Sequence, residues 1–410
     1  MDEHLLRLVA VLAVAMMVAI AARQFRLPYT VGLVFVGAVL AVTKPDFGMH
    51  LTHEMIFDLI LPPLLFEAAL SLSWRELMRD SAPLLALAGL GTLVSAAVVT
   101  VACVILLGWP APSALVFGAL IAATDPVAII AMFKDNDIKG RLRLLVESES
   151  LLNDGAAAVL FVMALAFAES GGAGESLGEI AMTLGRIVFG GVAIGALCGF
   201  AAIAASLRTS EHMIEAALTT IAAFGSFLVA EYFHDSGVLA TVTAGLIMGN
   251  LGVLREDEGG YLSLKGREFV IAFWEFAAFI ANSVVFLLIG VDVASTPFQS
   301  YGAPLLLAVI GIVLVARAVT VYPLSAIFLV SRWKVTLGEQ HVLWWGGLRG
   351  ALALALALSL PDSLPMRDTI VVVTFGVVAF SIVIQGLTMP LLLRALGFLP
   401  AENSANGGHH

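Results

Sequence analysis

The feature that most constrains this chain is a series of long apolar runs that contain no charged residue. One of them extends from Leu84 to Leu107, which exceeds the roughly 20 apolar residues that an α-helix needs to cross a bilayer. Apolar side chains make up 60% of the 410 residues and charged ones only 13%, too few to cover a soluble protein. Transmembrane β-strands alternate polar and apolar residues, and these runs do not. The sequence therefore predicts an all-α polytopic membrane protein.

Prolines, glycines and charge clusters divide the chain into thirteen apolar segments, which we interpret as transmembrane helices. They lie at 5–22, 28–43, 53–70, 82–107, 112–133, 142–169, 178–206, 212–232, 236–250, 269–292, 302–330, 339–360 and 367–396. Because Asp2 and Glu3 precede the first segment in place of a basic start, it is predicted to be a span rather than a signal peptide. We expect residues 1–398 to form one transmembrane domain and residues 399–410 to form a disordered tail.

The loops between these segments differ in charge. Alternate loops hold fifteen Lys and Arg residues on one side and three on the other, namely Arg7, Lys44 and Arg367. Since basic loops stay in the cytoplasm, we expect the N-terminus outside, the C-terminus in the cytoplasm, and a location in the plasma (inner) membrane. The net charge of −10 lies mostly in loops, and the sequence lacks the basic stripe that would bind nucleic acid.

The order of the segments indicates an internal repeat. Segments one to six and eight to thirteen would form two six-helix halves of opposite orientation, with segment seven as a linker. The fifth and twelfth segments then hold equivalent places, and helix-disturbing residues lie near the middle of each: Thr124-Asp-Pro126 in one and Gly346–Gly350 in the other. Paired interrupted helices in inverted halves are typical of transporters with a site at the bilayer midplane. We expect the two helices to cross there.

Asp125 lies in the first interruption, where a charge costs about 2.5–3.5 kcal/mol and so requires a role. Pro126 disfavours helical geometry in the residue before it. The open turn would expose the carbonyl and hydroxyl oxygens of Thr124 as ligands for a hard cation. Asp125 itself would either bind the ion or face the free N–H groups of a half-helix, and the sequence leaves both roles open.

The sixth segment brings carboxylates and hydroxyls onto neighbouring ridges of one helix. Ser150 and Asp154 are four residues apart and share a face, and Glu149 and Asn153 form an adjacent pair with the same spacing. Facing Thr124, these groups would make an all-oxygen site, which suits hard cations and protons. The sequence has no His or Cys cluster at this depth, so no metal cofactor is expected.

Two arginines, Arg349 and Arg317, lie too deep in their segments to reach the membrane surface. We expect Arg349 to form an ion pair with Glu149 across the bundle, because Glu149 otherwise lacks a counter-ion. Arg317 is expected to neutralise the crossing of the interrupted helices. Both are interpreted as supports of the site rather than as ligands of the ion.

Five motifs together resemble the sodium/proton antiporters of the NhaP/NHE type, within the monovalent cation:proton antiporter superfamily. They are Leu61-Pro-Pro-Leu-Leu-Phe-Glu67, Ala123-Thr-Asp-Pro126, Glu149-Ser-Leu-Leu-Asn-Asp-Gly155, Phe286-Leu-Leu-Ile-Gly290 and Gly346-Gly-Leu-Arg-Gly-Ala351, and they occur in the family's order. The resemblance implies a homodimer of thirteen-helix protomers, each with an interface domain and a mobile six-helix core.

By motif match, the resemblance implies that Asp154 binds the ion and carries the proton, and that Ser150, Thr124 and Glu67 complete the site. It likewise implies the pairing of Glu149 with Arg349. The Asn-Asp pair at 153–154 resembles the electroneutral branch of the superfamily, whereas electrogenic relatives have two aspartates there.

The sequence thus favours exchange of Na⁺ (or Li⁺) for H⁺ by alternating access, electroneutral at one to one, in sodium and pH homeostasis. K⁺/H⁺ exchange would use the same kinds of ligand and stays open. A channel is disfavoured by the two buried arginines, and a sensor that uses the fold without turnover is a further alternative. The sequence contains no nucleotide-binding glycine loop, metal cluster or nucleophile–base pair that would indicate an enzyme or a cofactor.

Overall fold

The computed structural model describes residues 2–25, 28–43, 50–170, 177–254 and 260–399. These residues form helices joined by turns, with no β-strand among them, which confirms the predicted all-helical class. The predicted tail, apart from Leu399, lies outside the described residues, as do the basic residues Arg26, Lys44 and Arg255.

The predicted apolar segments overlap helices throughout the described chain. Its first half contains α1 (Asp2–Phe25), α2 (Tyr29–Thr43), η2 (Met55–Ile60), α3 (Leu61–Ser71), α4 (Trp74–Arg79), α5 (Ser81–Leu85), η3 (Ala86–Leu90), α6 (Gly91–Leu107), α7 (Ala111–Ile121), α8 (Val127–Asp135), α9 (Arg141–Glu169) and α10 (Leu177–Ser206). Its second half contains α11 (His212–Tyr232), α12 (Gly237–Met248), η4 (Gly249–Val253), α13 (Leu264–Ser295), α14 (Phe298–Tyr301), α15 (Ala303–Ala326), α16 (Leu337–Trp345), α17 (Ala351–Leu358), α18 (Arg367–Phe380), η5 (Ser381–Gln385) and α19 (Gly386–Ala395).

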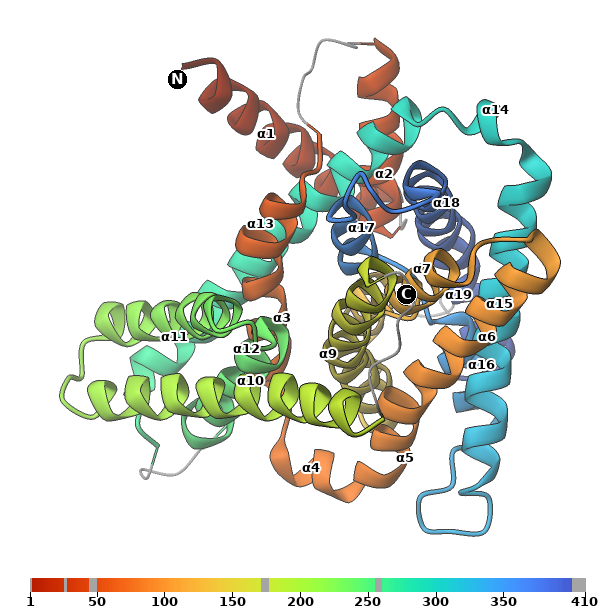
Figure 1. Cartoon of the computed structure of the whole chain (residues 1–410). Coiled ribbons are helices and arrows are strands. Elements are labelled where there is room, and N and C mark those ends of the chain that lie inside the picture. The colour runs from red at the N-terminus through yellow and green to blue at the C-terminus, as the bar shows by residue number, and fades with distance from the viewer. Residues whose placement is uncertain (1, 26–27, 44–49, 171–176, 255–259, 400–410) are drawn as a thin grey trace.

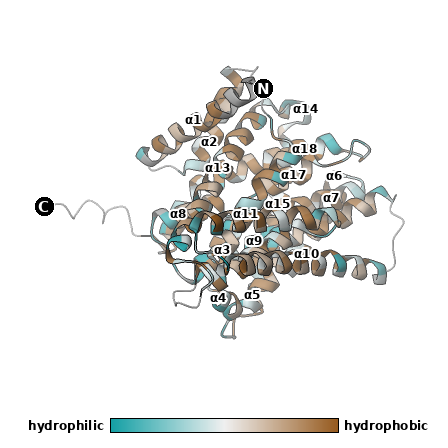
Figure 2. Cartoon of the chain, turned by 90° about the vertical axis from the view of Figure 1, so that its left-hand side faces the viewer, coloured by the Kyte–Doolittle hydropathy of each residue, from teal (hydrophilic) through white to brown (hydrophobic). Residues whose placement is uncertain are grey.

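Seven helical stretches of the described chain are long and apolar enough to cross a membrane. They are Ser81–Leu107, Arg141–Glu169, Gly178–Ser206, His212–Tyr232, Leu264–Ser295, Ala303–Ala326 and Arg367–Ala395. Shorter apolar helices lie at Val9–Ala22, Tyr29–Thr43, Ala111–Ile121 and Gly237–Val253. Hydrophobic residues cover most of the helical surface, and polar ones gather mainly toward helix ends and turns (Figure 2). This is the pattern of a multi-pass integral membrane protein.

The helices pack in two groups (Figure 1). In one group α10, α11 and α12 pack on one another and on α3 and α13. In the other group α9 packs against α7, α7 against α6, and α15 against α6 and α18. The short helices α8, α16 and α17 belong to this second group, so both interrupted helices lie inside it beside α9.

A close helix crossing in the described chain joins α2 to α13. Gly37 faces the Leu287 carbonyl, and Gly290 faces the Val34 carbonyl, each so closely that a Cβ atom would collide with the backbone opposite. Small residues permit such close approach of helices in a membrane, where van der Waals contact replaces the hydrophobic effect as the driving force. The Phe286–Gly290 motif therefore contributes to packing and does not contact the acids of α9 through any bond of the described residues.

Candidate ion-binding site

Two helices are interrupted at the positions that the sequence predicted. The first break, Ala122–Pro126, separates α7 from α8, and the second, Gly346–Gly350, separates α16 from α17. The breaks contact each other directly, because the backbone N–H of Asp125 donates a hydrogen bond of 2.8 Å to the Leu348 carbonyl. Two chain segments more than two hundred residues apart therefore cross where both have left the helix.

Asp125 lies at the start of two half-helices. Its Oδ1 accepts a hydrogen bond of 2.9 Å from the Val127 backbone N–H, at the beginning of α8. Its carboxylate also packs against Gly350, at the beginning of α17, so closely that a Cβ atom there would collide with Oδ2. A carboxylate at a helix N-terminus is stabilised by the free N–H groups and the helix dipole. Of the two roles that the sequence left open, these contacts favour the electrostatic one.

Oxygen atoms from α9 converge on the first break. The Thr124 hydroxyl donates to the Ser150 hydroxyl at 3.2 Å, and the Ser150 hydroxyl in turn donates to the Thr124 carbonyl. The amide of Asn153 lies 3.4 Å from both the Thr124 hydroxyl and a Glu149 oxygen. The structure thus brings Thr124 together with Ser150 and Asn153.

Asp154 provides the unsatisfied acid beside this cluster. Its Oδ1 is buried and has no hydrogen-bond partner among the described residues, and the same holds for Oδ1 of Asn153. The Asp154 carboxylate is close enough to Asp125, Glu149 and Arg349 to interact with them electrostatically. Since buried polar atoms are nearly always paired, an unpaired carboxylate oxygen on Asp154 suits a group that binds a cation or a proton.

The ion pair of Glu149 is present, but the sequence-based prediction of its arginine partner is wrong. Glu149 pairs with Arg317 rather than with Arg349, through two hydrogen bonds of 2.8 Å between the guanidinium and the two carboxylate oxygens. The side chains are only 3% and 5% exposed. Arg317 also donates to the Leu343 carbonyl near the end of α16. A bidentate pair of this kind is the strongest geometry available to arginine and carboxylate.

Arg349 takes the role that the sequence assigned to Arg317. Its guanidinium donates to the carbonyls of Ala122 and Ala123, at 2.9 and 2.8 Å, where α7 ends and its last carbonyls lack helical partners. A cation at a helix C-terminus is favourable for the same reason that an anion is favourable at an N-terminus. The two arginines have exchanged their predicted functions, because Arg349 lies within the break itself and faces the other break.

Glu67 does not join the Asp154 cluster through any hydrogen bond or ion pair of the described residues. It lies 3.6 Å from Nζ of Lys134 at the end of α8, and Lys134 also lies 3.9 Å from Glu275 on α13. The contacts of Lys134 therefore link α3 and α13 to α8, the second half of the first interrupted helix.

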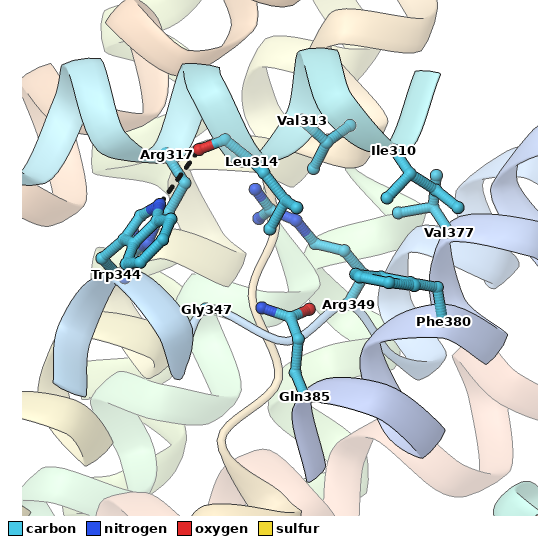
Figure 3. A pocket seen from close by; sticks show the side chains of 10 residues that line it. All are labelled: Ile310, Val313, Leu314, Arg317, Trp344, Gly347, Arg349, Val377, Phe380 and Gln385. Atoms are coloured by element: carbon cyan, nitrogen blue, oxygen red, sulfur yellow. Dashed lines mark hydrogen bonds between the residues drawn. The ribbon is translucent and has the colours of Figure 1, made fainter. Parts of the chain in front are cut away.

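The sequence reasoning missed two buried residues of η5, Ser381 and Gln385. Ser381 bonds to the backbone of Arg349, and Gln385 bonds to the carbonyl of Trp345. A narrow pocket lies between α15, α16 and the α18–η5 helix, and the side chains of Gln385 and Arg349 both line it (Figure 3). The signal that could have found the pair is their polarity in the largely apolar middle of segment 367–396, since such residues often bond between helices.

The whole chain resembles known proteins. Residues 9–395 match the family described as the transmembrane sodium/hydrogen exchanger. The chain is 37% identical over 407 residues to the Na⁺/H⁺ antiporter ApNhaP of Aphanothece halophytica, covering 97% of this chain and 75% of that protein. It is 33% identical to the Na⁺/H⁺ antiporter NhaH of Halobacillus dabanensis, covering 96% of this chain and 98% of the relative.

Among solved structures, the sodium proton antiporter MjNhaP1 of Methanocaldococcus jannaschii has the same fold, with a TM-score of 0.76 at 20% identity, covering 96% of this chain and all of that one. The family match covers nearly the full length of the chain, and both relatives are more than 30% identical to it. This chain belongs to the sodium/hydrogen exchanger family.

Proposed function

We propose that this protein is a secondary antiporter that exchanges Na⁺ (or Li⁺) for H⁺ across the membrane, with Asp154 as the exchanging acid. The observation that carries the proposal is the buried Oδ1 of Asp154, which has no partner among the described residues and lies beside the crossing of two interrupted helices. The other charges nearby have partners. Arg317 neutralises Glu149, while Asp125 and Arg349 lie at the ends of half-helices.

One carboxylate is enough to couple the two fluxes. Asp154 can hold a cation or a proton but not both, so the ion that arrives displaces the one already bound. If the site opens to one side of the membrane at a time, each occupied state carries one ion across. The hydroxyls of Thr124 and Ser150 and the Thr124 carbonyl would supply neutral oxygens for Na⁺. Glu67 does not bond to these residues, so its carboxylate would act on the ion only from outside this cluster.

The proposal extends to the organisation of the protein. We infer thirteen transmembrane helices in two inverted six-helix repeats, α10 as the linker between them, and a homodimer in the plasma (inner) membrane with the C-terminus in the cytoplasm. The pairing of one interrupted helix in each half, together with the asymmetry of basic residues between the two sets of loops, supports this arrangement. The protein would act as a transporter in sodium and pH homeostasis, without a catalysed reaction or a cofactor.

The experiment that tests the proposal is transport by the purified protein in proteoliposomes under an imposed pH gradient. Na⁺, Li⁺ and K⁺ are added separately, and a pH-sensitive dye inside the vesicles reports proton movement. We expect Na⁺ and Li⁺ to drive proton flux and K⁺ to do so weakly. Equal flux with K⁺ would contradict the sodium assignment, and no flux with any of the three would contradict antiport altogether.

Replacing Thr124 or Ser150 with alanine should weaken Na⁺ binding without stopping transport. Each removes one neutral oxygen, which water can replace at modest cost, so we expect the KM for Na⁺ to rise about threefold to tenfold while the maximum rate changes less. Ser148 is the matched control, because it is buried on the same helix but lies two residues before Ser150, on a different face. Loss of all transport with unchanged Na⁺ binding would refute the ligand assignment.

Exchange should be electroneutral, because Asn153 occupies the place of a second acid. An amide carries no proton in either state of the cycle, so one Na⁺ would exchange for one H⁺ and no net charge would move. The test is to clamp the membrane potential of proteoliposomes with valinomycin and K⁺ at values of either sign. The initial exchange rate is expected to stay constant, whereas a strong dependence on potential would mean that a second proton is carried by another acid such as Asp125 or Glu67.

A further inference from the structure

Two buried polar residues of the last long helix hold the second interrupted helix from both sides of its break. Ser381 and Gln385 begin and end η5, a π-helical turn between α18 and α19, and they are only 1% and 3% exposed. A π-helical turn inside an α-helix changes the direction of the side chains that follow it, and such turns are frequent at functional sites. Neither residue contacts the oxygen cluster around Asp154 through a bond of the described residues.

Ser381 binds the chain just before α17. Its hydroxyl accepts a hydrogen bond of 3.0 Å from the Arg349 backbone N–H and lies 3.0 Å from the Arg349 carbonyl, to which it can donate. Arg349 is the residue whose guanidinium covers the carbonyls at the end of α7. The position of its backbone therefore affects the first break as well as the second.

Gln385 binds the C-terminal end of α16. Its Nε2 donates a hydrogen bond of 2.8 Å to the carbonyl of Trp345, the last residue of that half-helix, where carbonyls have no helical partner. In Figure 3 its amide points from the η5 helix toward Arg349 and the chain at Gly347. With Ser381 at one end and Gln385 at the other, the segment Gly346–Gly350 is fixed at both of its ends.

This segment bonds to the first break, which carries Thr124, through the guanidinium of Arg349 and through the backbone of Leu348. The Leu348 carbonyl, in the middle of the segment, accepts the hydrogen bond from the Asp125 backbone N–H. The neighbouring residue Thr124 provides the carbonyl and hydroxyl that bond to Ser150. Because the Asp125 N–H and the Thr124 carbonyl belong to the same planar peptide unit, any shift of Leu348 would move the Thr124 carbonyl.

We propose that Ser381 and Gln385 are positioning residues for the cation, which set Na⁺ affinity by holding the Gly346–Gly350 segment and, through Leu348 and Asp125, the oxygens of Thr124. The inference rests on the proposed function, since it assigns Na⁺ to this cluster. A positioning role and a purely structural role predict different effects of mutation. Loss of stability alone lowers the amount of active protein, whereas displaced ligand oxygens change the affinity of every correctly folded molecule.

The test compares Gln385→Met and Ser381→Ala with Thr388→Val as the matched control. Met has nearly the length of Gln but no N–H group, and Ala removes only the hydroxyl. Thr388, on α19, also bonds to Trp345, but to Nε1 of its indole ring at 2.8 Å rather than to its backbone. For each purified protein, the KM for Na⁺ is measured in proteoliposomes and the Kd for Na⁺ by calorimetry, with the rate normalised to folded protein.

We expect Gln385→Met and Ser381→Ala each to raise the KM and Kd for Na⁺ about tenfold, with the normalised maximum rate within about twofold of the unmodified protein. Thr388→Val should leave all three values within about twofold. Unchanged KM and Kd in the two test variants, or an equal shift in the control, would overturn the inference. Na⁺ binding without transport by the unmodified protein would instead contradict the proposed function, and the Kd comparison would still test this inference.

Discussion

Replacing Asp154 with asparagine is expected to abolish exchange and to leave the protein folded. Asparagine has nearly the same shape as aspartate but can hold neither a proton nor the charge that attracts Na⁺. Because Oδ1 of Asp154 has no hydrogen-bond partner among the described residues, the change breaks no bond to that atom. Proton flux driven by Na⁺ in proteoliposomes should fall to the level of vesicles without protein, while size-exclusion behaviour and thermal unfolding stay close to those of the unmodified protein.

The control for this change is Asp137→Asn, which removes an acid at the surface. Asp137 is 81% exposed and pairs with Lys139 at 2.6 Å, away from the oxygen cluster, so its variant should transport normally. The unmodified protein should also lose activity at acid pH, because protons then outcompete Na⁺ for Asp154. A well-folded Asp154→Asn protein that retains the original exchange rate would show that another group carries the ions.

Breaking the ion pair between Glu149 and Arg317 should have the largest effect on stability. Both side chains are at most 5% exposed and share two bonds of 2.8 Å, so removal of one partner leaves a buried charge uncompensated. That typically costs about 3–5 kcal/mol of unfolding free energy. Arg317→Ala should lower it by more than Glu149→Gln, because Arg317 also bonds to the Leu343 carbonyl. Unfolding of the purified proteins in detergent measures the difference.

A double-mutant cycle identifies which arginine is the partner of Glu149. Glu149→Gln combined with Arg317→Ala should lose clearly less stability than the sum of the two single changes. Glu149→Gln combined with Arg349→Ala should be closer to additive, since Arg349 bonds to backbone carbonyls of the first break. A larger coupling of Glu149 with Arg349 than with Arg317 would restore the pairing expected from the sequence and contradict the geometry described here.

The sequence was sufficient to predict where the helices lie and where two of them break. Apolar residues must cover the backbone in a bilayer, so hydropathy alone outlines the helices. The two breaks could be located because their causes are local. Pro126 cannot donate a backbone hydrogen bond, and three glycines between 346 and 350 weaken the second helix. The contact of Asn153 with Glu149, four residues apart on α9, also followed from helical spacing.

The partners of the two buried arginines could not be predicted in the same way. Spacing along a helix gives the depth and the face of a side chain, but not which neighbouring helix that face meets. Arg317 and Arg349 lie at similar depths in different helices, and the rotation of α15 decides which of them meets Glu149. The same limit explains why Ser381 and Gln385 were missed, since only the packing of η5 on the second break gives them a role.

Glu67 shows a further limit of inference from motifs. Its motif suggested a place in the ion site, yet its described contacts are with Lys134. A carboxylate on α3 reaches the end of α8 rather than the crossing, because α3 packs mainly on α12 and α13. A motif match assigns a residue to a family pattern, and the three-dimensional contacts decide which groups that residue meets in this chain.

The measurement that tests the central claim most directly is the number of protons released when Na⁺ binds. Calorimetric titrations of the purified protein with Na⁺, in buffers of different ionisation enthalpy at one pH, give this number without any need for transport. If one carboxylate holds either ion, about one proton should leave for each Na⁺ bound under conditions in which the acid is protonated, and Asp154→Asn should bind no Na⁺. Binding of Na⁺ without proton release at every pH, or unchanged binding by Asp154→Asn, would contradict exchange at a single shared acid.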